Sequence, residues 1–321
     1  MDILTIVDNK QKDYNTKMNQ NFLKNELADI VGADNVRENV ELSGYTSFKI
    51  GGPCRLMIEP GSPFEVREVV QLLKAREMPF VVIGKGSNLL VSDRGYEGAV
   101  ILINRNLDKV RTEGTRITAQ AGASLSSVAL AALADSLTGF EFAAGIPGTI
   151  GGACVMNAGA YGGELKDVLV KATVLTPEGE IIQMDRDELE LGYRTSVIPA
   201  KQLIVLEAEI ELTPGDGAAI KARMNELRDQ RISKQPLNYP SAGSTFKRPE
   251  GYFAGKLIQD AGLKGYSVGG AEVSVKHSGF VVNKGGATAS DVYKLINNVI
   301  ELVRQDSGVT LEPEVKFLGE F

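Results

Sequence analysis

The clearest hydrophobic pattern along the chain predicts a strand–helix–strand unit. Residues 55–60 are typical of a short strand that a proline ends, and the apolar run 80–83 is typical of a buried strand. Between them a helix begins after Ser62, a good N-cap, with Pro63 suited to the first helical position and Glu65 completing a capping box. The apolar residues of this helix recur at a spacing that places them on one face: Val66, Val69, Val70 and Leu73.

Other segments carry patterns that predict further elements. Helices are predicted at 21–31, 124–133 and 218–231, and from Thr288 or Ser290 to the residue before Gly308. Strands are predicted at 101–103, 116–119, 168–175, 181–184, 203–212, 280–283 and 311–318. The glycine-dense stretch 139–163 cannot form a long helix. The Pro- and Gly-containing segment 213–217 is the best linker candidate, so we expect a domain boundary at 213–220.

Length and composition predict a folded protein of more than one domain. The chain has 321 residues, of which 43% are hydrophobic and 24% charged, as in globular proteins with domains of about 100–200 residues. The apolar run at the N-terminus is too short for a secretion signal, and no run reaches the ~18 apolar residues of a membrane span. With two cysteines only, we expect a cytoplasmic protein without membrane insertion. A formal charge of −6 disfavours nucleic acid as a partner.

The scarcity of histidine and cysteine restricts the chemistry. Because His277 is the single histidine, a two-histidine zinc site is excluded, and Cys54 and Cys154 are too far apart for a local zinc module. We therefore expect no metal site. A Ser-His-Asp or Cys-His nucleophile would depend entirely on His277. If the protein is an enzyme, a bound cofactor is the expected source of its chemistry.

A first glycine loop follows the predicted strand at 80–83. Its sequence is Ile83-Gly84-Lys85-Gly86-Ser87-Asn88-Leu89. Successive backbone N–H groups without bulky side chains are suited to binding phosphate oxygens. The loop lacks the third glycine of the dinucleotide-binding fingerprint and the Ser or Thr of a Walker loop. Its residues alone are explained equally well by a hairpin turn and by a ligand site.

A second glycine loop is harder to explain as a turn. Its sequence is Ala144-Gly145-Ile146-Pro147-Gly148-Thr149-Ile150-Gly151-Gly152-Ala153. The glycines allow the backbone to lie flat against a large planar or phosphorylated ligand, while the apolar residues anchor it from behind. Tight helix packing on small residues is the alternative. The continuation, Met156-Asn157-Ala158-Gly159-Ala160-Tyr161-Gly162-Gly163, adds polar backbone and amide groups that suit the edge of a heterocycle.

Two further clusters lie in the last third of the chain. Hydroxyls and cations gather in Ser241-Ala242-Gly243-Ser244-Thr245-Phe246-Lys247-Arg248-Pro249, just after Arg231 and Lys234, although a solvated basic turn has the same composition. The segment Leu311-Glu312-Pro313-Glu314-Val315 is expected to place two carboxylates on one face of the terminal strand, and the alternative is that both simply face water.

Taken together and in order, these motifs resemble the UDP-N-acetylenolpyruvoylglucosamine reductase family, flavoenzymes of peptidoglycan precursor synthesis. The resemblance rests on the two glycine loops, 157–161, Tyr193-Arg194-Thr195-Ser196, 242–247 and 311–315, and it covers roughly residues 42–320. It implies an α+β fold with a two-part FAD-binding domain of vanillyl-alcohol-oxidase type and an α+β substrate domain. The expected domains are a leader at 1–41, FAD subdomain 1 at 42–104 rejoined by 311–321, FAD subdomain 2 at 105–214, and a substrate domain at 218–310.

The resemblance also implies the cofactor and the substrate. Residues 84–89 and 145–152 would wrap the pyrophosphate of bound FAD, and residues 157–159 would lie near the flavin ring. NADPH would first reduce the flavin as co-substrate. The flavin N5 would then deliver a hydride to the vinyl carbon of UDP-N-acetylglucosamine enolpyruvate, a small UDP-sugar, giving UDP-N-acetylmuramate.

The family's catalytic residues map onto Arg194, Ser244 and Glu314. Hydride addition leaves negative charge that a bidentate guanidinium such as that of Arg194 can stabilise. Ser244 would protonate the carbanion-like carbon. Glu314 would donate a hydrogen bond if burial in the closed site keeps its carboxyl protonated. The remaining family positions are the diphosphate contacts, Arg231 and Lys234, and a substrate-side tyrosine, Tyr161.

One departure from the family pattern concerns a tyrosine-bearing loop that one branch carries between the Arg and Ser motifs. Only 50 positions separate Arg194 from Ser244, with no obvious insert, so the chain resembles the shorter branch. His277 either faces the substrate or has a structural role. The rival hypotheses are another FAD oxidoreductase of the same superfamily and a nucleotide-sugar-binding protein without turnover. The oligomeric state has no signal in the sequence.

Overall fold

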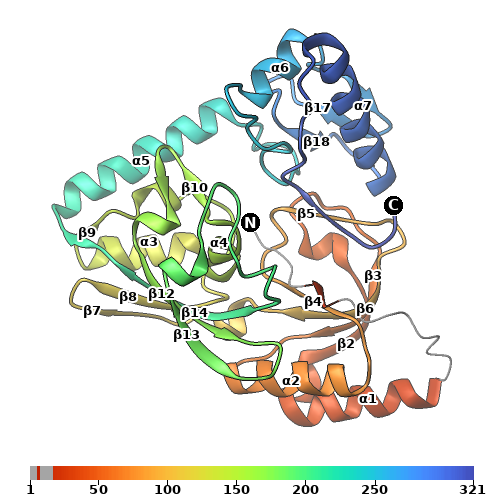
Figure 1. Ribbon diagram of the computed structural model, residues 1–321, viewed down its shortest axis with the longest axis vertical. Coiled ribbons are helices and arrows are strands. Elements are labelled where there is room, and N and C mark those ends of the chain that lie inside the picture. Colours follow the sequence, from red (N-terminus) through yellow and green to blue (C-terminus); the bar gives the residue numbers. More distant parts are fainter. Residues whose placement is uncertain (1–5, 8–16) are drawn as a thin grey trace. The chain divides into compact units, whose positions relative to one another are not determined.

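The structure is a computed structural model that describes residues 6–7 and 17–321, with side chains from residue 22 onward. Its elements are labelled in Figure 1. The chain forms two compact units, each assembled from three stretches of sequence. Unit 1 contains the described residues up to 40 together with 54–85 and 97–228, and unit 2 contains 41–53, 86–96 and 229–321. The N-terminal run used to argue against a secretion signal lies mostly outside the described residues.

The first sheet of unit 1 contains the strand–helix–strand pattern expected from the sequence. Its strand order is β1 (Ile6–Val7), β4 (Phe80–Ile83), β6 (Tyr96–Leu102), β3 (Pro53–Ile58) and β2 (Val36–Glu41). Strands β4 and β6 are parallel, whereas β1 is antiparallel to β4. Helices α1 (Lys17–Val31) and α2 (Pro63–Ala75) lie side by side in Figure 1 and contact each other, and their apolar faces join the core of unit 1.

The caps of α2 explain why the helix begins where the sequence predicts. The Ser62 hydroxyl accepts a hydrogen bond from the Glu65 N–H at 3.2 Å, and Pro63 occupies the first turn. The Glu65 carboxylate accepts from the N–H of Gly61 at 2.8 Å, not from that of Ser62. The reciprocal contact of the expected capping box is thus displaced by one residue, from Ser62 to Gly61.

The second sheet of unit 1 is antiparallel. Its strand order is β13 (Ile181–Asp185), β12 (Leu169–Leu175), β14 (Ile204–Glu211), β8 (Arg116–Gln120) and β7 (Val110–Glu113). Helices α3 (Leu125–Ala134) and α4 (Ile150–Met156) pack against it. The segment expected to be a linker is structured: β15 (Thr213–Pro214) pairs with β9 (Leu137–Thr138), and α5 (Gly217–Lys234) follows directly.

Unit 2 has its own apolar core around one long helix. Strands β16 (Ser267–Val268), β17 (Ala271–Val273) and β18 (Val281–Asn283) form an antiparallel sheet. Helices α6 (Ala254–Asp260) and α7 (Ala289–Ser307) contact each other, and α7 buries one face in this core. The cap of α7 is Thr288, which forms a capping box with Asp291, and Gly308 ends the helix with φ of 74°. Of the two expected N-caps, Thr288 is therefore the one used.

The last strand is shorter than the sequence predicts. Residues 311–318 were expected as one strand, but only β19 (Lys316–Leu318) forms, in parallel with β5 (Leu89–Val91). The preceding residues instead make an isolated bridge in which Phe246 pairs with Pro313. A proline lacks the N–H that a continuous ladder needs, so regular pairing begins after it.

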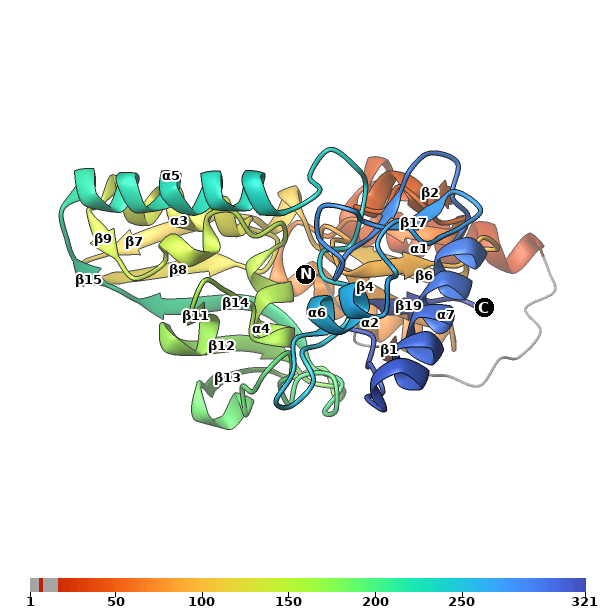
Figure 2. The same cartoon turned by 90° about the horizontal axis from the view of Figure 1, so that it is seen from above.

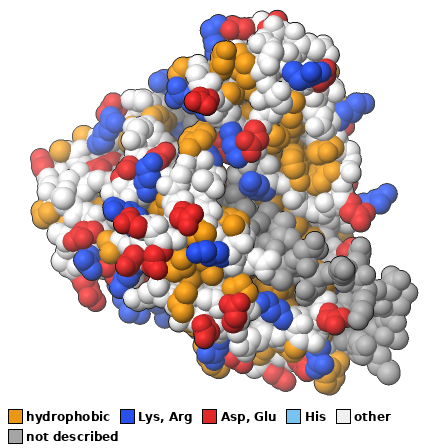
Figure 3. All heavy atoms as spheres, viewed as in Figure 1, with side chains coloured by type: hydrophobic (Ala, Val, Ile, Leu, Met, Phe, Trp, Pro, Cys, Tyr) orange, Lys and Arg blue, Asp and Glu red, His pale blue; other side chains and the backbone are white. Residues whose placement is uncertain are grey.

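Short 3-10 helices complete the described fold: Ala33–Asn35, Leu42–Tyr45, Arg105–Leu107, Glu141–Ala143, Leu165–Asp167 and Asp187–Leu189. No helix among the described residues is long and apolar enough to cross a membrane. On the face drawn in Figure 3, acidic and basic side chains of the described residues are intermixed. The expected domains were defined by function, whereas the two units are defined by which residues contact each other. The expected boundaries therefore stay predictions: 1–41, 42–104 with 311–321, 105–214 and 218–310.

Candidate functional site

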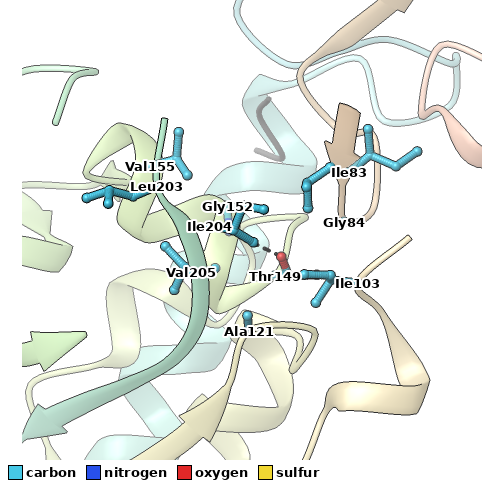
Figure 4. Close-up of a pocket in the computed structure, with 12 residues that line it drawn as sticks. Ile83, Gly84, Ile103, Ala121, Thr149, Gly152, Val155, Leu203, Ile204 and Val205 are labelled. Carbon is cyan, nitrogen blue, oxygen red and sulfur yellow. Dashed lines mark hydrogen bonds between the residues drawn. The ribbon is translucent and has the colours of Figure 1, made fainter. Parts of the chain in front are cut away.

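The two glycine loops of unit 1 meet at one pocket of about 360 Å³, counted with the part open to solvent. From the first loop, Gly84 lines the pocket at the end of β4, next to Ile83. From the second loop, Thr149, Gly151 and Gly152 line it at the start of α4. Figure 4 labels Ile83, Gly84, Thr149 and Gly152 around the space, with the Thr149–Gly152 hydrogen bond drawn as a dashed line. Two loops more than sixty residues apart in the sequence therefore share one concave surface.

Close packing against a neighbouring loop explains part of the glycine pattern at 148–152. A Cβ on Gly151 would lie 2.8 Å from the Cβ of Ala121, so only glycine fits there. The Gly151 N–H donates to the Ala121 carbonyl at 2.9 Å, and the Ile150 N–H donates to the Ala123 carbonyl at 2.8 Å. The Gly152 N–H donates to the Thr149 hydroxyl at 3.3 Å. Because these three N–H groups already have acceptors, a phosphate in this pocket must be bound by other donors.

The apolar residues of the second loop divide into two environments. Ile146 and Ile150 are buried in the core of unit 1, as expected for residues that anchor the loop from behind. Pro147 and Gly145 are exposed. Gly148 is buried and has a φ of 152°, a conformation open to glycine.

The first glycine loop is divided between the units: Lys85 still belongs to unit 1, and the residues from Gly86 onward belong to unit 2. Lys85 is exposed, whereas Gly86, Ser87, Asn88 and Leu89 are buried. A Cβ on Gly86 would lie 2.1 Å from the Tyr45 carbonyl oxygen, and the φ of Gly86 is 58°. The Asn88 side-chain amide donates to the Glu314 carbonyl at 3.1 Å. Gly86 and Asn88 thus have packing roles that the sequence did not indicate.

Asn157 joins three segments of unit 1. It ends α4 in a left-handed conformation with φ of 46° and is fully buried. Its Nδ2 donates to the Glu164 carboxylate and to the Gly192 carbonyl, both at 3.0 Å, while its Oδ1 accepts from the Lys166 N–H at 2.9 Å. Both amide protons are therefore used within the protein. The sequence predicts that this segment faces a heterocycle, and in the structure the Asn157 amide connects it to Glu164, Lys166 and Gly192.

Arg194 lies in a tight turn next to that segment. Gly192 and Thr195 pair across the turn, and Arg194 has φ of 56°. Its Nη2 donates to the Gly159 carbonyl at 3.1 Å, and its guanidinium lies 5.1 Å from the centre of the exposed Tyr193 ring. Arg194 and residues 157–159, which the family resemblance assigns to catalysis and to the surroundings of the flavin ring, thus lie together in unit 1.

Glu164 is an acidic group beside Arg194 that the sequence did not single out. Partial burial alone would raise the pKa of this carboxyl. Hydrogen bonds from Lys166 and Asn157, and the positive charges of Lys166 and Arg194, outweigh burial and hold the pKa below its ordinary value. Glu164 is therefore ionised at neutral pH.

Thr245, the buried residue directly after Ser244, connects the Ser244 and Glu314 segments of unit 2. The Glu314 N–H donates to the Thr245 carbonyl at 2.8 Å, so the exposed Ser244 and the buried Glu314 lie on adjoining strands of backbone. The Thr245 N–H donates to the Gly279 carbonyl at 2.8 Å, and its hydroxyl accepts from the Val281 N–H at 2.9 Å. Thr245 thus fixes both candidate catalytic residues to the sheet of unit 2.

The two carboxylates of 312–314 do not share one face as the sequence predicted. Glu314 is 7% exposed, whereas Glu312 is exposed and forms an ion pair with Lys247. The bridge between Phe246 and Pro313 turns successive side chains toward different surroundings. The alternative that both carboxylates simply face water is also wrong, because Glu314 is buried.

The other candidate residues are distributed over both units. Tyr161 is in unit 1, in the two-residue turn between β10 (Gly159–Ala160) and β11 (Gly163–Glu164), with φ of 53°. Arg231 and Lys234 lie near the end of α5 and belong to unit 2 by contact. His277 is partly buried: its Nδ1 accepts from the Gly279 N–H at 3.2 Å, and burial lowers its pKa. Among the residues that the structure describes, no group of His, Cys, Asp and Glu is arranged to hold a metal ion.

Several pocket residues were missed at the level of sequence. They are apolar residues of strands, loops and helix α4: Val82, Ile103, Ala121, Val155, Leu203, Ile204 and Val205. Their hydrophobicity looked like that of core residues, and no local signal separates the two. The one available hint was the position of Val82 and Ile83 directly before a glycine loop.

Comparisons with known proteins agree over most of the chain. Residues 54–185 match the family model described as FAD binding domain, and residues 235–318 match the C-terminal domain of UDP-N-acetylenolpyruvoylglucosamine reductase. The reductase of that name from Agathobacter rectalis is 53% identical over 316 residues, covering 95% of this chain and 100% of that protein. The one from Caldanaerobacter subterraneus subsp. tengcongensis is 51% identical, covering 93% of this chain and 99% of that protein.

A solved structure supports the same assignment. The crystal structure of UDP-N-acetylenolpyruvylglucosamine reductase from Thermus caldophilus superposes with a TM-score of 0.76 at 34% identity, covering 88% of this chain and 100% of that one. The expected α+β fold with an FAD-binding domain and a second, C-terminal domain is confirmed. The chain therefore belongs to the UDP-N-acetylenolpyruvoylglucosamine reductase family and is an FAD-dependent oxidoreductase.

Proposed function

We propose that this protein reduces UDP-N-acetylglucosamine enolpyruvate to UDP-N-acetylmuramate with NADPH, a step of peptidoglycan precursor synthesis. The observation that carries the proposal is the direct backbone link between the Ser and Glu motifs, in which the Glu314 N–H donates to the residue after Ser244. That link gives the chain a proton donor and a buried carboxyl in one place. The names of relatives about 50% identical over most of the chain supply the substrate.

The pocket of unit 1 fits part of a flavin dinucleotide. Glycines 84, 151 and 152 offer flat backbone surface, Thr149 adds a polar group, and the remaining lining is apolar, which suits a large ligand with planar aromatic rings. We assign cofactor contacts to the two loops: Gly84, Lys85, Gly86, Ser87, Asn88, Leu89, Gly145, Ile146, Pro147, Gly148, Thr149, Ile150, Gly151 and Gly152. Asn157, Ala158 and Gly159 complete this proposed set. When bound, FAD takes a hydride from NADPH and passes it to the enolpyruvyl double bond.

The roles of the side chains follow from where charge develops. Addition of a hydride to the terminal vinyl carbon leaves an electron pair at the neighbouring carbon, next to the substrate carboxylate. The Arg194 guanidinium stabilises this negative charge, and the Ser244 hydroxyl delivers the proton that completes the reduction. Glu314, which is buried, assists as a hydrogen-bond donor. Arg231 and Lys234 bind the diphosphate, and Tyr161 contacts the substrate.

The wider assignments belong to the same proposal. The chain represents the branch without an inserted tyrosine loop, because 50 positions separate Arg194 from Ser244. The FAD-binding part comprises 42–104 with 311–321 and 105–214, and the substrate domain comprises 218–310. NADPH and nucleotide sugars are cytoplasmic metabolites, so we place the enzyme in the cytoplasm.

Two half-reactions test the proposal. Anaerobic NADPH should bleach the flavin absorbance of the purified protein, and UDP-N-acetylglucosamine enolpyruvate should restore it. A flavin that stays reduced after that addition rejects this substrate and favours another FAD oxidoreductase. A protein that binds the UDP-sugar but never changes its flavin spectrum is a binding protein without turnover.

A serine variant tests the proton donor. Ser244→Ala should leave reduction by NADPH within about twofold of the wild type and slow reoxidation by orders of magnitude, because only the second half-reaction needs the proton. Ser241→Ala, in the same loop, is the matched control and should leave both rates unchanged. Equal losses in both half-reactions of Ser244→Ala contradict the assigned role.

A further inference from the structure

Two hydrogen bonds of opposite direction join the Arg194 turn to the segment after α4. The Asn157 side chain donates to the Gly192 carbonyl at 3.0 Å, and the Arg194 guanidinium donates to the Gly159 carbonyl at 3.1 Å. All four residues belong to unit 1. The turn is thus tied to this segment through Gly192, and the Arg194 guanidinium is anchored to it through Nη2.

The Arg194 turn holds a conformation that an arginine does not adopt without support. A φ of 56° is left-handed, a conformation that is unfavourable for a residue with a Cβ. Such a residue persists only where surrounding contacts determine its backbone, which is a recurrent property of functional sites. The two hydrogen bonds from the 157–159 segment are contacts of this kind.

Glu164 is the charged member of the same cluster. Its carboxylate accepts from Asn157 Nδ2 at 3.0 Å and from Lys166 Nζ at 2.8 Å. It also forms a capping box with Asp167, in which each side chain accepts from the other residue's backbone N–H. Glu164 is the cross-strand partner of Gly159 in the β10–β11 pair, and the Arg194 guanidinium donates to the Gly159 carbonyl, so these contacts fix a negative charge beside Arg194.

We infer that Glu164 is a positioning residue for Arg194: held by Asn157 and Lys166, its carboxylate keeps the guanidinium in the orientation anchored on Gly159. The inference rests on the proposed function, since it assigns a purpose to the placement of Arg194. Glu164 touches neither the substrate nor the cofactor in this scheme. It acts through the electrostatic attraction between two ionised groups in a partly buried site.

A purely structural role for Glu164, limited to the turn at 163–167, is the alternative. The chain offers a matched control, because Asp167 is the other half of the same capping box. Asp167→Asn weakens that turn as Glu164→Gln does. Of the two acidic residues, however, Glu164 is the cross-strand partner of Gly159, the residue to which Arg194 donates, whereas Asp167 lies in the 3-10 turn that follows.

The test compares the two half-reactions of the FAD-loaded protein. Glu164→Gln should leave flavin reduction by NADPH within about twofold and slow reoxidation by UDP-N-acetylglucosamine enolpyruvate about tenfold, while Asp167→Asn should leave both within about twofold. Added to Arg194→Lys, Glu164→Gln should slow reoxidation by less than about twofold relative to Arg194→Lys alone, because the guanidinium that Glu164 positions is no longer present.

The outcomes separate the inference from the proposed function. If the wild-type flavin is not reoxidised by the enolpyruvyl substrate, the proposed function fails and the inference fails with it. If the wild type is reoxidised normally and Glu164→Gln is as fast, the inference alone is wrong. Equal slowing by Asp167→Asn, or an undiminished effect of Glu164→Gln in the Arg194→Lys background, shows that Glu164 only supports the turn.

Discussion

Replacing Thr245 with valine tests how the Ser and Glu motifs are held together. Thr245 is fully buried, and its backbone N–H and C=O are hydrogen-bonded to Gly279 and Glu314. Its hydroxyl makes one further hydrogen bond, which it accepts from the Val281 N–H. Valine has nearly the same volume, so Thr245→Val removes that one hydrogen bond and leaves the backbone contacts to Gly279 and Glu314 possible. The variant therefore isolates the contribution of a single hydroxyl.

The expected loss of stability follows from the buried donor that the variant leaves behind. A buried N–H without an acceptor costs about 1–3 kcal/mol, and the added methyl group returns up to ~0.8 kcal/mol by burial. The free energy of unfolding should fall by about 1–2 kcal/mol. Thr245→Ser keeps the hydroxyl and loses one buried methyl, which costs about 1 kcal/mol.

Activity separates the two variants more sharply than stability. Without its anchor on Val281, the segment that carries Ser244 should be held less firmly beside Glu314, although the Glu314 N–H can still donate to the carbonyl of residue 245. Flavin reoxidation by the enolpyruvyl substrate should therefore fall at least about tenfold in Thr245→Val and stay within about threefold in Thr245→Ser. Urea unfolding and anaerobic stopped-flow absorbance give the two readouts. Equal reoxidation rates in both variants would refute the positioning role of the hydroxyl.

Three further changes test other parts of the structure. Asp93→Ala should destabilise the protein by about 2 kcal/mol in urea unfolding, because the Asp93 carboxylate accepts three hydrogen bonds at the N-terminus of α7; a loss below about 0.5 kcal/mol would contradict this. Gly151→Ala should lower flavin content on purification, since its Cβ would lie 2.8 Å from that of Ala121, whereas Gly61→Ala, whose Cβ meets nothing closer than 3.7 Å, should not. Backbone hydrogen bonds in the α7 capping box lower the pKa of Asp291, so its stabilisation is present above the unfolded pKa of about 3.9 and is lost as the pH falls through the lower folded value. The difference in stability between the wild type and Asp291→Asn should accordingly shrink below about pH 4, and a difference that grows there would show the wrong sign.

Local sequence determined the elements whose causes lie within a few residues. Ser62 and Thr288 cap helices because their hydroxyls reach N–H groups three positions along the chain, a geometry that any helix start provides. Gly308 ends α7 because it accepts a left-handed backbone conformation. The order of the motifs was likewise enough to indicate the family, since it depends on residue identity alone.

Only the tertiary structure decided the surroundings of the functional residues. Glu312 and Glu314 look equivalent in the sequence, but pairing with the chain near Thr245 exposes the first and buries the second. Glu164 carried no signal at all, because its importance comes from Asn157 and Arg194, which reach it from other segments. Burial, close approach and electrostatic interaction depend on distance in space. Residue patterns report only distance along the chain, so the sequence determined which groups are present and the fold determined what each one contacts.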